Sequence, residues 1–257
     1  MNLVYYSQED LRWKNQMYSN IRDSNQTIGL TGCGPTSFAM VYSSFTGKSL
    51  LPPEAAKYSV DHGFRTSENG TSWALFPSIA KSYGLSCAAT GSLNAVKKAL
   101  SDGALVIASM SAGGHFTRGG HFIVLTGAHD GLIDVMDPNP DNDNYKHDGM
   151  IAEGVKNDGR VSGKESVFQS EARQYWIFTY RNEEDEPMND AERKAFEELG
   201  KRVAQLEADK KTPAPDWFLN EFGSADLGGI IEDPHGTTDF WRGLAVVIRA
   251  ARQGKLR

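Results

Sequence analysis

One short segment limits what this chain can fold into more than any other: Gly32-Cys33-Gly34-Pro35-Thr36-Ser37, a cysteine between two glycines. Four apolar residues then follow at spacings of three and four: Phe38, Val41, Tyr42 and Phe45. This spacing is typical of the buried face of an amphipathic helix. Pro35 suits the first turn of a helix, and Gly47 suits its end. The sequence therefore predicts a buried helix that begins at Cys33.

A cysteine at the start of a helix has two interpretations. Backbone N–H groups and the positive end of the helix dipole stabilise a thiolate there, so an ordinary thiol pKa of about 8.5 can fall to roughly 3.5–7.5. A thiolate of this kind is a nucleophile. Alternatively, Cys33 is a small apolar residue of the core. Read by itself, the segment does not separate the two interpretations.

The bulk composition excludes several classes of protein. With 257 residues, 39% of them hydrophobic and 23% charged, the chain fits one large domain or one domain with a small second module. A net charge of −6 and the absence of a Lys/Arg run argue against nucleic-acid binding. No apolar stretch approaches the roughly 20 residues of a membrane span. The N-terminus lacks the basic and apolar segments of a secretory signal, so we expect synthesis in the cytoplasm without a signal peptide.

The chain contains two cysteines, Cys33 and Cys87. Two are too few for a disulfide scaffold or a cysteine-based zinc site, and free thiols are typical of a reducing cytoplasm. We interpret Cys87, which lies in a short predicted strand, as core packing. Four histidines have no partner at ligand spacing: His62, His129, His147 and His235. The sequence therefore predicts no metal and no other cofactor.

Up to about residue 181, short helical and extended patterns alternate as in an α+β domain. Residues 1–32 are polar and turn-rich and are expected to be extended chain and loops. Helices are predicted to start at residue 52 and to cover 73–83 and 93–100. Strands are predicted at 85–90, 105–110, 121–127, 132–136 and 174–181. The glycine-rich segment 141–163 is expected to be a loop, and Trp73 is expected in the core.

The segment 113–127 contains a second candidate catalytic residue, His121. Its glycines predict a loop whose backbone approaches a ligand closely, and His121 follows this loop immediately before a strand. Asp130-Gly131 predicts a hairpin turn, and Asp137 ends the second strand of that hairpin. Residues paired across this turn have numbers that sum to about 260, which makes Asp137 a diagonal neighbour of His121. The sequence thus brings a histidine and a carboxylate together at one end of a sheet.

These residue types form one mechanism. His121 would take the thiol proton, Cys33 would attack an acyl carbon, and Asp137 would hold the imidazole in the correct tautomer. The oxyanion hole is expected from the Cys33 backbone N–H and a glutamine amide, either Gln8 or Gln26. The residues expected to contact substrate are Gly32, Gly34, Gly119, Gly120 and His115.

A run of acidic and amide residues resembles part of a calcium loop: Asp137, Asn139, Asp141, Asp143 and Asp148. Asn142 stands where the motif requires glycine, and Asp148 where it requires a bidentate Glu. A polar loop is therefore the favoured interpretation, with calcium binding between Asp141 and Asp148 left open.

A second, helical module is predicted after an acidic linker at 182–189. Residues 190–211 predict a charged helix with apolar residues spaced three, four and three apart: Phe196, Leu199, Val203 and Leu206. Two heptads fall short of a coiled-coil prediction. Two further helices are predicted at 217–222 and 241–252, with Trp217 in the core. No nucleophile–base pair lies here, so residues 190–257 are interpreted as a cell-wall-binding or oligomerisation module and residues 1–181 as the catalytic domain.

Four ordered motifs resemble the bacteriocin-processing-like branch of the papain-like cysteine peptidases: Tyr5-Tyr6-Ser7-Gln8 with Trp13, Thr27-Ile28-Gly29 before the Cys33 segment, Gly119–Gly127, and Asp137-Pro138. The resemblance covers about residues 1–180 and implies a helical part packed on an antiparallel sheet. It implies Cys33 as nucleophile, His121 as base and Asp137 as orienting acid, and it favours Gln8 over Gln26 in the oxyanion hole. Transporter-fused members continue into membrane spans and a nucleotide-binding domain. Neither follows here, so leader-peptide processing is not expected.

The C-terminal part resembles the small helical modules of phage and prophage wall hydrolases of Gram-positive hosts. The likeness lies in Gly228-Gly229-Ile230-Ile231 and in the segment 240–250. This architecture implies a phage endolysin that acts on the cell wall after release and cleaves an amide or peptide bond of peptidoglycan. No membrane partner is expected, and a homo-oligomer formed through the C-terminal helices is left open. The alternatives are a protein-directed cysteine protease and a non-catalytic wall-binding protein.

Overall fold

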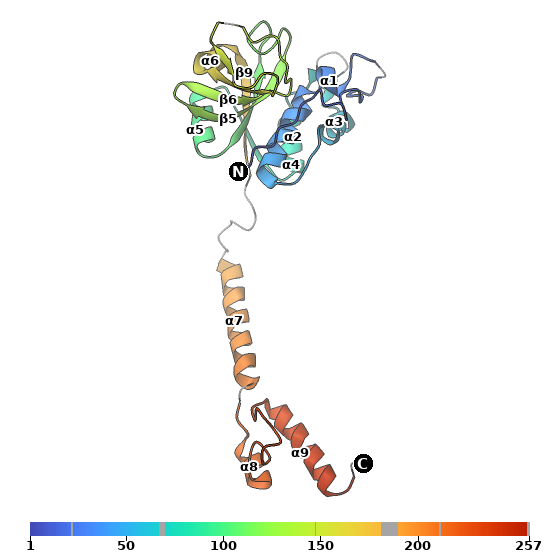
Figure 1. Cartoon of the computed structure of the whole chain (residues 1–257), viewed down its shortest axis with the longest axis vertical. Coiled ribbons are helices and arrows are strands. Elements are labelled where there is room, and N and C mark those ends of the chain that lie inside the picture. Colours follow the sequence, from blue (N-terminus) through green and yellow to red (C-terminus); the bar gives the residue numbers. More distant parts are fainter. Residues whose placement is uncertain (22, 67–69, 147, 181–189, 211, 256–257) are drawn as a thin grey trace. The chain divides into compact units, whose positions relative to one another are not determined.

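The computed structural model describes residues 1–21, 23–66, 70–146, 148–180, 190–210 and 212–255 (Figure 1). The chain divides into two compact units, Met1–Glu183 and Glu184–Arg257. The expected linker at 182–189 and His147, one of the histidines without a predicted partner, lie outside the described residues.

Helix α2 (Cys33–Thr46) begins and ends where the sequence predicts. Gly47 ends the helix in the left-handed conformation, with a φ of 66°. Gly32 precedes the helix at a close approach, because a Cβ there would lie 2.5 Å from the carbonyl oxygen of Ile28. Ser37 ties the helix to the sheet, its hydroxyl donating to the carbonyl of Phe122 at 3.3 Å. The close approach at Gly32 and the hydrogen bond of Ser37 together fix the start of α2 relative to the sheet.

Further helices cover the first unit: α1 (Ile28–Thr31), α3 (Pro52–Asp61), α4 (Leu75–Ser82) and α5 (Leu93–Ser101). Helix α1 contradicts the expectation of extended chain and loops throughout residues 1–32. The backbone N–H of Gly32 donates to the carbonyl of Ile28 at 2.8 Å and closes this single turn. The turn is too short to carry a hydrophobic period, so the sequence pattern did not reveal it.

The described strands form a seven-stranded antiparallel sheet in the order β3-β9-β4-β5-β6-β8-β7. Their bounds are β3 (Ser86–Thr90), β4 (Leu105–Met110), β5 (His121–His129), β6 (Leu132–Met136), β7 (Ile151–Glu153), β8 (Arg160–Lys164) and β9 (Ala172–Thr179). A separate ribbon pairs β1 (Arg65–Thr66) with β2 (Gly70–Thr71). In the β5–β6 hairpin, Val124 pairs with Met136 and Leu125 with Val135, as the turn predicts, before a bulge shifts the register.

The prediction of a loop at 141–163 is wrong in its second half. Strands β7 and β8 lie there, and helix α6 (Glu165–Glu171) follows directly. Strand β8 pairs with β6 along its whole length and buries Val161. Cross-strand pairing, and not a hydrophobic pattern of its own, holds so polar a strand in place.

Both faces of the sheet are covered, which explains the uninterrupted apolar run of β4. Leu105 and Ile107 belong to one core together with residues of α2 and α4. Val106 and Ala108 belong to the other, together with residues of α5 and α6. Figure 1 shows α2 and α5 on different sides of this sheet. The α+β class predicted from the sequence is confirmed.

Two tryptophans expected in the core lie at the surface. Trp73 is 40% exposed, and its ring packs edge-on against buried Trp176 of β9 at 5.6 Å between centroids. Trp217 is 38% exposed, while Trp241 is fully buried. Both predictions are wrong because another tryptophan, Trp176 in the first unit and Trp241 in the second, occupies the core.

The second unit contains α7 (Asp190–Lys210), α8 (Asp216–Phe222) and α9 (Thr238–Arg252). Helices α8 and α9 pack through Phe218, Trp241 and Ala245. Every α7 side chain whose burial is described is exposed, including those of the predicted apolar stripe. Among the described residues, no helix combines the length and apolar character needed to cross a bilayer.

Candidate active site

The first turn of α2 and the start of β5 meet at a cavity of about 490 Å³. Cys33 and His121 line this cavity. Asp137 lies directly behind His121 and is completely buried. The structure therefore brings Cys33, His121 and Asp137 together, the last two through the hairpin as the sequence predicts.

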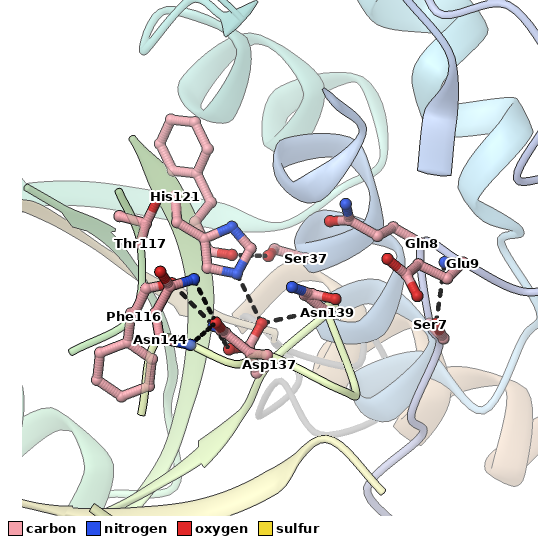
Figure 2. Close-up of polar contacts among 12 residues, drawn as sticks. Ser7, Gln8, Glu9, Ser37, Phe116, Thr117, His121, Asp137, Asn139 and Asn144 are labelled. Carbon is pink, nitrogen blue, oxygen red and sulfur yellow. Dashed lines mark hydrogen bonds and ion pairs between the residues drawn. The ribbon is translucent and has the colours of Figure 1, made fainter. Parts of the chain in front are cut away.

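His121 and Asp137 form a short, buried ion pair. The Nε2 atom of His121 lies 2.6 Å from Oδ1 of Asp137, and the histidine is only 8% exposed (Figure 2). A second contact joins His121 to the thiol of Cys33 through a side-chain hydrogen bond. Because Asp137 engages Nε2, the other ring nitrogen is the one left to face the sulfur.

The charges in this site shift the pKa values in opposite directions. Burial alone would raise the pKa of Cys33, but the hydrogen bond and positive charge of His121 outweigh it and lower the pKa below its ordinary value. Burial alone would lower the pKa of His121, but the charge of Asp137 and the contact with Cys33 raise it to about 10. The site thus favours a thiolate beside an imidazolium, which is the form of a cysteine ready to attack an acyl carbon.

Asp137 is held by more donors than the sequence indicates. Its Oδ2 accepts from Asn142 Nδ2 at 2.9 Å and from the hydroxyl of Tyr145 at 2.7 Å. Its Oδ1 also accepts from the backbone N–H of Asn139 at 2.9 Å. A buried carboxylate needs hydrogen-bond donors, so the amide and hydroxyl residues near Asp137 in the sequence were candidates for this role. The sequence does not show which of them point toward Asp137.

Gln8 lines the same cavity and is 6% exposed. Its Nε2 donates to the carbonyl of Gly29 at 2.7 Å, and a carboxamide nitrogen carries a second hydrogen that an oxyanion can accept from. Figure 2 shows its side chain directed toward the region of His121. The alternative, Gln26, accepts a hydrogen bond from Arg65 and does not line the cavity. The geometry therefore favours Gln8.

A family model described as the Peptidase_C39 like family matches residues 2–160. The chain belongs to the Peptidase_C39-like family. It is accordingly a cysteine peptidase, a hydrolase with the papain-like fold that the sequence motifs indicate.

Several solved structures are similar to this C39-like peptidase. The peptidase domain of Streptococcus ComA, a bifunctional ABC transporter, is 18% identical, with a TM-score of 0.41, and the match covers 59% of this chain and 93% of that one. A structure described as a C39-like peptidase from Bacillus anthracis is 16% identical, with a TM-score of 0.46, and the match covers 71% and 96%. A double-glycine-motif protease from an AMS/PCAT transporter is 21% identical, with a TM-score of 0.39, and the match covers 59% and 86%. The comparison with curated proteins finds no match.

The predicted substrate-contacting glycines have different surroundings in this C39-like peptidase. Gly120 lines the cavity, whereas Gly32, Gly34 and Gly119 are not among its lining residues. A Cβ on Gly34 would lie 2.7 Å from Oγ1 of Thr71, so this glycine allows α2 to pack closely. Gly32 and Gly34 therefore serve the position of Cys33 and do not contact the cavity.

The structure places His115 away from the cavity. Its Nδ1 lies 2.5 Å from Glu171 Oε1, and its Nε2 lies 3.0 Å from Asp148 Oδ2. Burial alone would lower the pKa of His115, but these two carboxylates raise it above its ordinary value. With both ring nitrogens engaged by anions, His115 clamps the glycine-rich loop to α6 and has no nitrogen free to contact substrate.

The acidic loop after Asp137 has partners other than a metal ion. Asn142 binds Asp137, Asp143 pairs with Arg118 at 3.6 Å, and Asp148 pairs with His115. Within the described ranges, no group of three or more His, Cys, Asp or Glu side chains is arranged to hold a metal. The hydrogen bond and ion pairs of Asn142, Asp143 and Asp148 are those of a polar loop.

Proposed function

We propose that this cysteine peptidase is an endolysin-like peptidoglycan hydrolase that cleaves an amide or peptide bond of the cell wall with Cys33, His121 and Asp137. The observation that carries the catalytic part is the buried pair of His121 with Asp137, 2.6 Å apart, next to a thiol of lowered pKa. The wall as substrate is supported by the second unit and by its likeness to the C-terminal modules of wall hydrolases.

The geometry supports a two-step acyl transfer. The Cys33 thiolate attacks the acyl carbon, the C–N bond breaks, and His121 gives its proton to the departing amine. Water then attacks the thioester while His121 takes its proton, and the carboxylic acid leaves as the Cys33 thiolate reforms. Asp137 keeps the imidazole oriented throughout. The Cys33 backbone N–H and the Gln8 amide stabilise the oxyanion in both steps.

The second unit lacks the combination of residue types that this mechanism needs. It contains no cysteine, and its one histidine, His235, lies against Asp233 at 2.6 Å on the surface. Several of its apolar side chains are exposed, among them Ile230 and Val247. These features support a role in binding the wall or in assembly.

Helix α7 supports assembly in particular. Phe196, Leu199, Val203 and Leu206 are each at least 48% exposed and occupy alternating core positions of two heptads. If a second copy packs in parallel on this stripe, Arg202 faces Glu207 of that copy across the seam, an attractive pair. We propose that α7 pairs with α7 of a second copy.

The decisive test of the proposed function is lysis of Gram-positive cell walls by the Cys33→Ala protein. We expect complete loss of lysis, with unchanged activity in the matched control Cys87→Ala. Burial raises the pKa of Cys87 to about 12, so its thiol stays protonated at neutral pH. Retained lysis by Cys33→Ala would overturn the mechanism.

Two further measurements separate the alternatives. Cleavage of casein with no effect on walls would indicate a protein-directed protease, and failure of a thiol-directed inhibitor to label Cys33 would favour a non-catalytic wall-binding protein. Mass analysis of digested peptidoglycan fragments then identifies the bond that is cut.

The assembly proposal is tested by measuring the molar mass of the full chain by light scattering. We expect a dimer whose mass falls to that of a monomer in Leu199→Glu. Ala204→Glu adds the same charge outside the stripe and should leave the dimer intact. A monomeric wild-type chain would reject the proposal.

A further inference from the structure

The charged or titratable side chains that line the cavity at Cys33, apart from the thiol itself, are basic. Its lining includes two basic side chains, His121 and Arg173, and no carboxylate among the described residues. His121 is already neutralised by Asp137 and Cys33. Arg173 is therefore the charge that a bound substrate would meet.

The backbone of β9 is irregular at Arg173. Ser109 of β4 pairs with Gln174 and Met110 pairs with Ala172, so Arg173 is the extra residue of a β-bulge. A bulge turns the side chain of its extra residue away from the direction that regular alternation would give it. Ser109 and Met110, the residues opposite the bulge, also line the cavity. The bulge thus places Arg173 at the same cavity as Cys33.

An aromatic ring supports the guanidinium in this position. The Cζ atom of Arg173 lies 5.5 Å from the ring centroid of Trp73, and Trp73 also lines the cavity. Trp73 in turn rests edge-on against buried Trp176. Arg173 is exposed and makes no ion pair with any residue that the structure describes. Its N–H groups are oriented by stacking and remain available to a ligand.

We propose that Arg173 binds a carboxylate of the substrate and so selects peptides that carry an acidic group next to the cleaved bond. A planar guanidinium binds a carboxylate through two parallel hydrogen bonds, and a carboxamide cannot reproduce this pairing. The inference rests on the proposed catalytic role of Cys33 but not on peptidoglycan as the substrate.

The test uses the full chain and a mixture of soluble peptides in pairs that differ only in Glu or Gln at one position. Mass analysis of the products gives the ratio of kcat/KM for each pair. We expect the wild-type enzyme to prefer the Glu peptide about five- to tenfold at one position, since the contact is charge-assisted but exposed to water. Arg173→Gln should reduce the ratio to about one by lowering kcat/KM for the Glu peptide more than for the Gln peptide, and Arg173→Lys should keep part of the preference.

Arg12→Gln is the matched control. Arg12 also lies over a tryptophan, 4.4 Å from the ring of Trp13, but it does not line the cavity. This variant should keep the wild-type preference. Binding of the same peptide pairs to the Cys33→Ala protein, measured by calorimetry, gives the comparison without turnover.

The proposal would be overturned by a Glu/Gln preference that survives Arg173→Gln. It would also be overturned if the wild-type enzyme or the Cys33→Ala protein did not distinguish the two peptides of a pair. An equal loss of kcat/KM on both peptides in Arg173→Gln would indicate a structural role and would overturn it as well. A Glu preference in peptides combined with intact walls would reject the wall substrate and uphold Arg173. Continued cleavage by Cys33→Ala would reject the catalytic role instead.

Discussion

Two regions of the peptidase unit carry the same Gly-His-Phe sequence six residues apart, yet their histidines have different surroundings. His115 and His121 are equally buried, each 8% exposed, and carboxylates raise the pKa of both. His121 has one carboxylate, on one ring nitrogen, and a thiol as its other partner. His115 has a carboxylate on each nitrogen. A base needs one nitrogen oriented by an acid and the other left for the reacting group, and only the His121 region meets that condition.

Replacing each histidine by glutamine should produce the largest difference between the two regions. We expect His121→Gln to lower kcat/KM by about 10²- to 10⁴-fold, because general-base catalysis and the imidazolium are lost. His115→Gln, the matched control, should lower it less than about fivefold. Steady-state kinetics on one peptide substrate measures both, and similar losses in the two variants would break the comparison.

The pH dependence of activity should distinguish the two histidine regions. On each limb of the profile we expect activity to change about tenfold per pH unit. The reactive ion pair exists between the lowered pKa of Cys33 and the raised pKa of His121, about 10. Activity should therefore rise with pH below the ordinary thiol range and fall above about 10. In His121→Gln the alkylation rate of Cys33 by iodoacetamide should shift its rise to higher pH, while His115→Gln should leave it in place. An unshifted rise in His121→Gln would show that His121 does not ionise the thiol.

A third experiment tests what holds the acid of the His121 region. Tyr145→Phe removes a donor to Asp137, and we expect kcat to fall about five- to tenfold with little change in KM, because the orientation of the imidazole loosens. Tyr175 is the matched control, since its buried hydroxyl donates to the Phe168 carbonyl at 2.8 Å, away from the site. An equal fall of kcat in Tyr175→Phe would indicate a general effect of lost packing.

The smallest expected effect concerns stability in the His115 region. A histidine whose pKa is raised by folding contributes stability that is fully present below about 6.5 and is lost as the pH rises through the raised value. The groups that face His115 are Glu171 and Asp148. His115→Gln should therefore cost about 1 kcal/mol at pH 6 and less at pH 9, measured by urea unfolding. A cost that does not change with pH would mean that the clamp does not depend on charge.

The His121 region could be predicted from the sequence because its parts are local. The turn at Asp130-Gly131 makes β5 and β6 a hairpin, and their register, shifted by one bulge, brings His121 to Asp137. Cys33 was predictable for a similar reason, since α2 carries a hydrophobic period and glycines at both ends.

The His115 region could not be predicted, because its partners are distant and leave no periodic trace. Glu171 belongs to α6, a short helix that follows a polar strand held by pairing with β6 and β7. Arg173 depends on a bulge, which alternation along β9 does not reveal. Trp73 is expected in the core and lies at the surface, because the sequence pattern does not tell which of two neighbouring tryptophans, Trp73 or Trp176, is buried.

The N-terminal segment has a consequence for the order in which the site appears during synthesis. The hydroxyl of Tyr5 donates to the carbonyl of Asp137 at 2.8 Å, and the backbone N–H of Gln8 donates to the carbonyl of Pro138 at 2.8 Å. At about 5–20 residues per second, a ribosome that has made Gln8 needs on the order of ten seconds to reach these partners. During that interval the nascent chain holds Cys33 without its base and its acid. With the proposed mechanism, the nascent chain stays inactive until His121 and Asp137 have been made and have folded against Cys33.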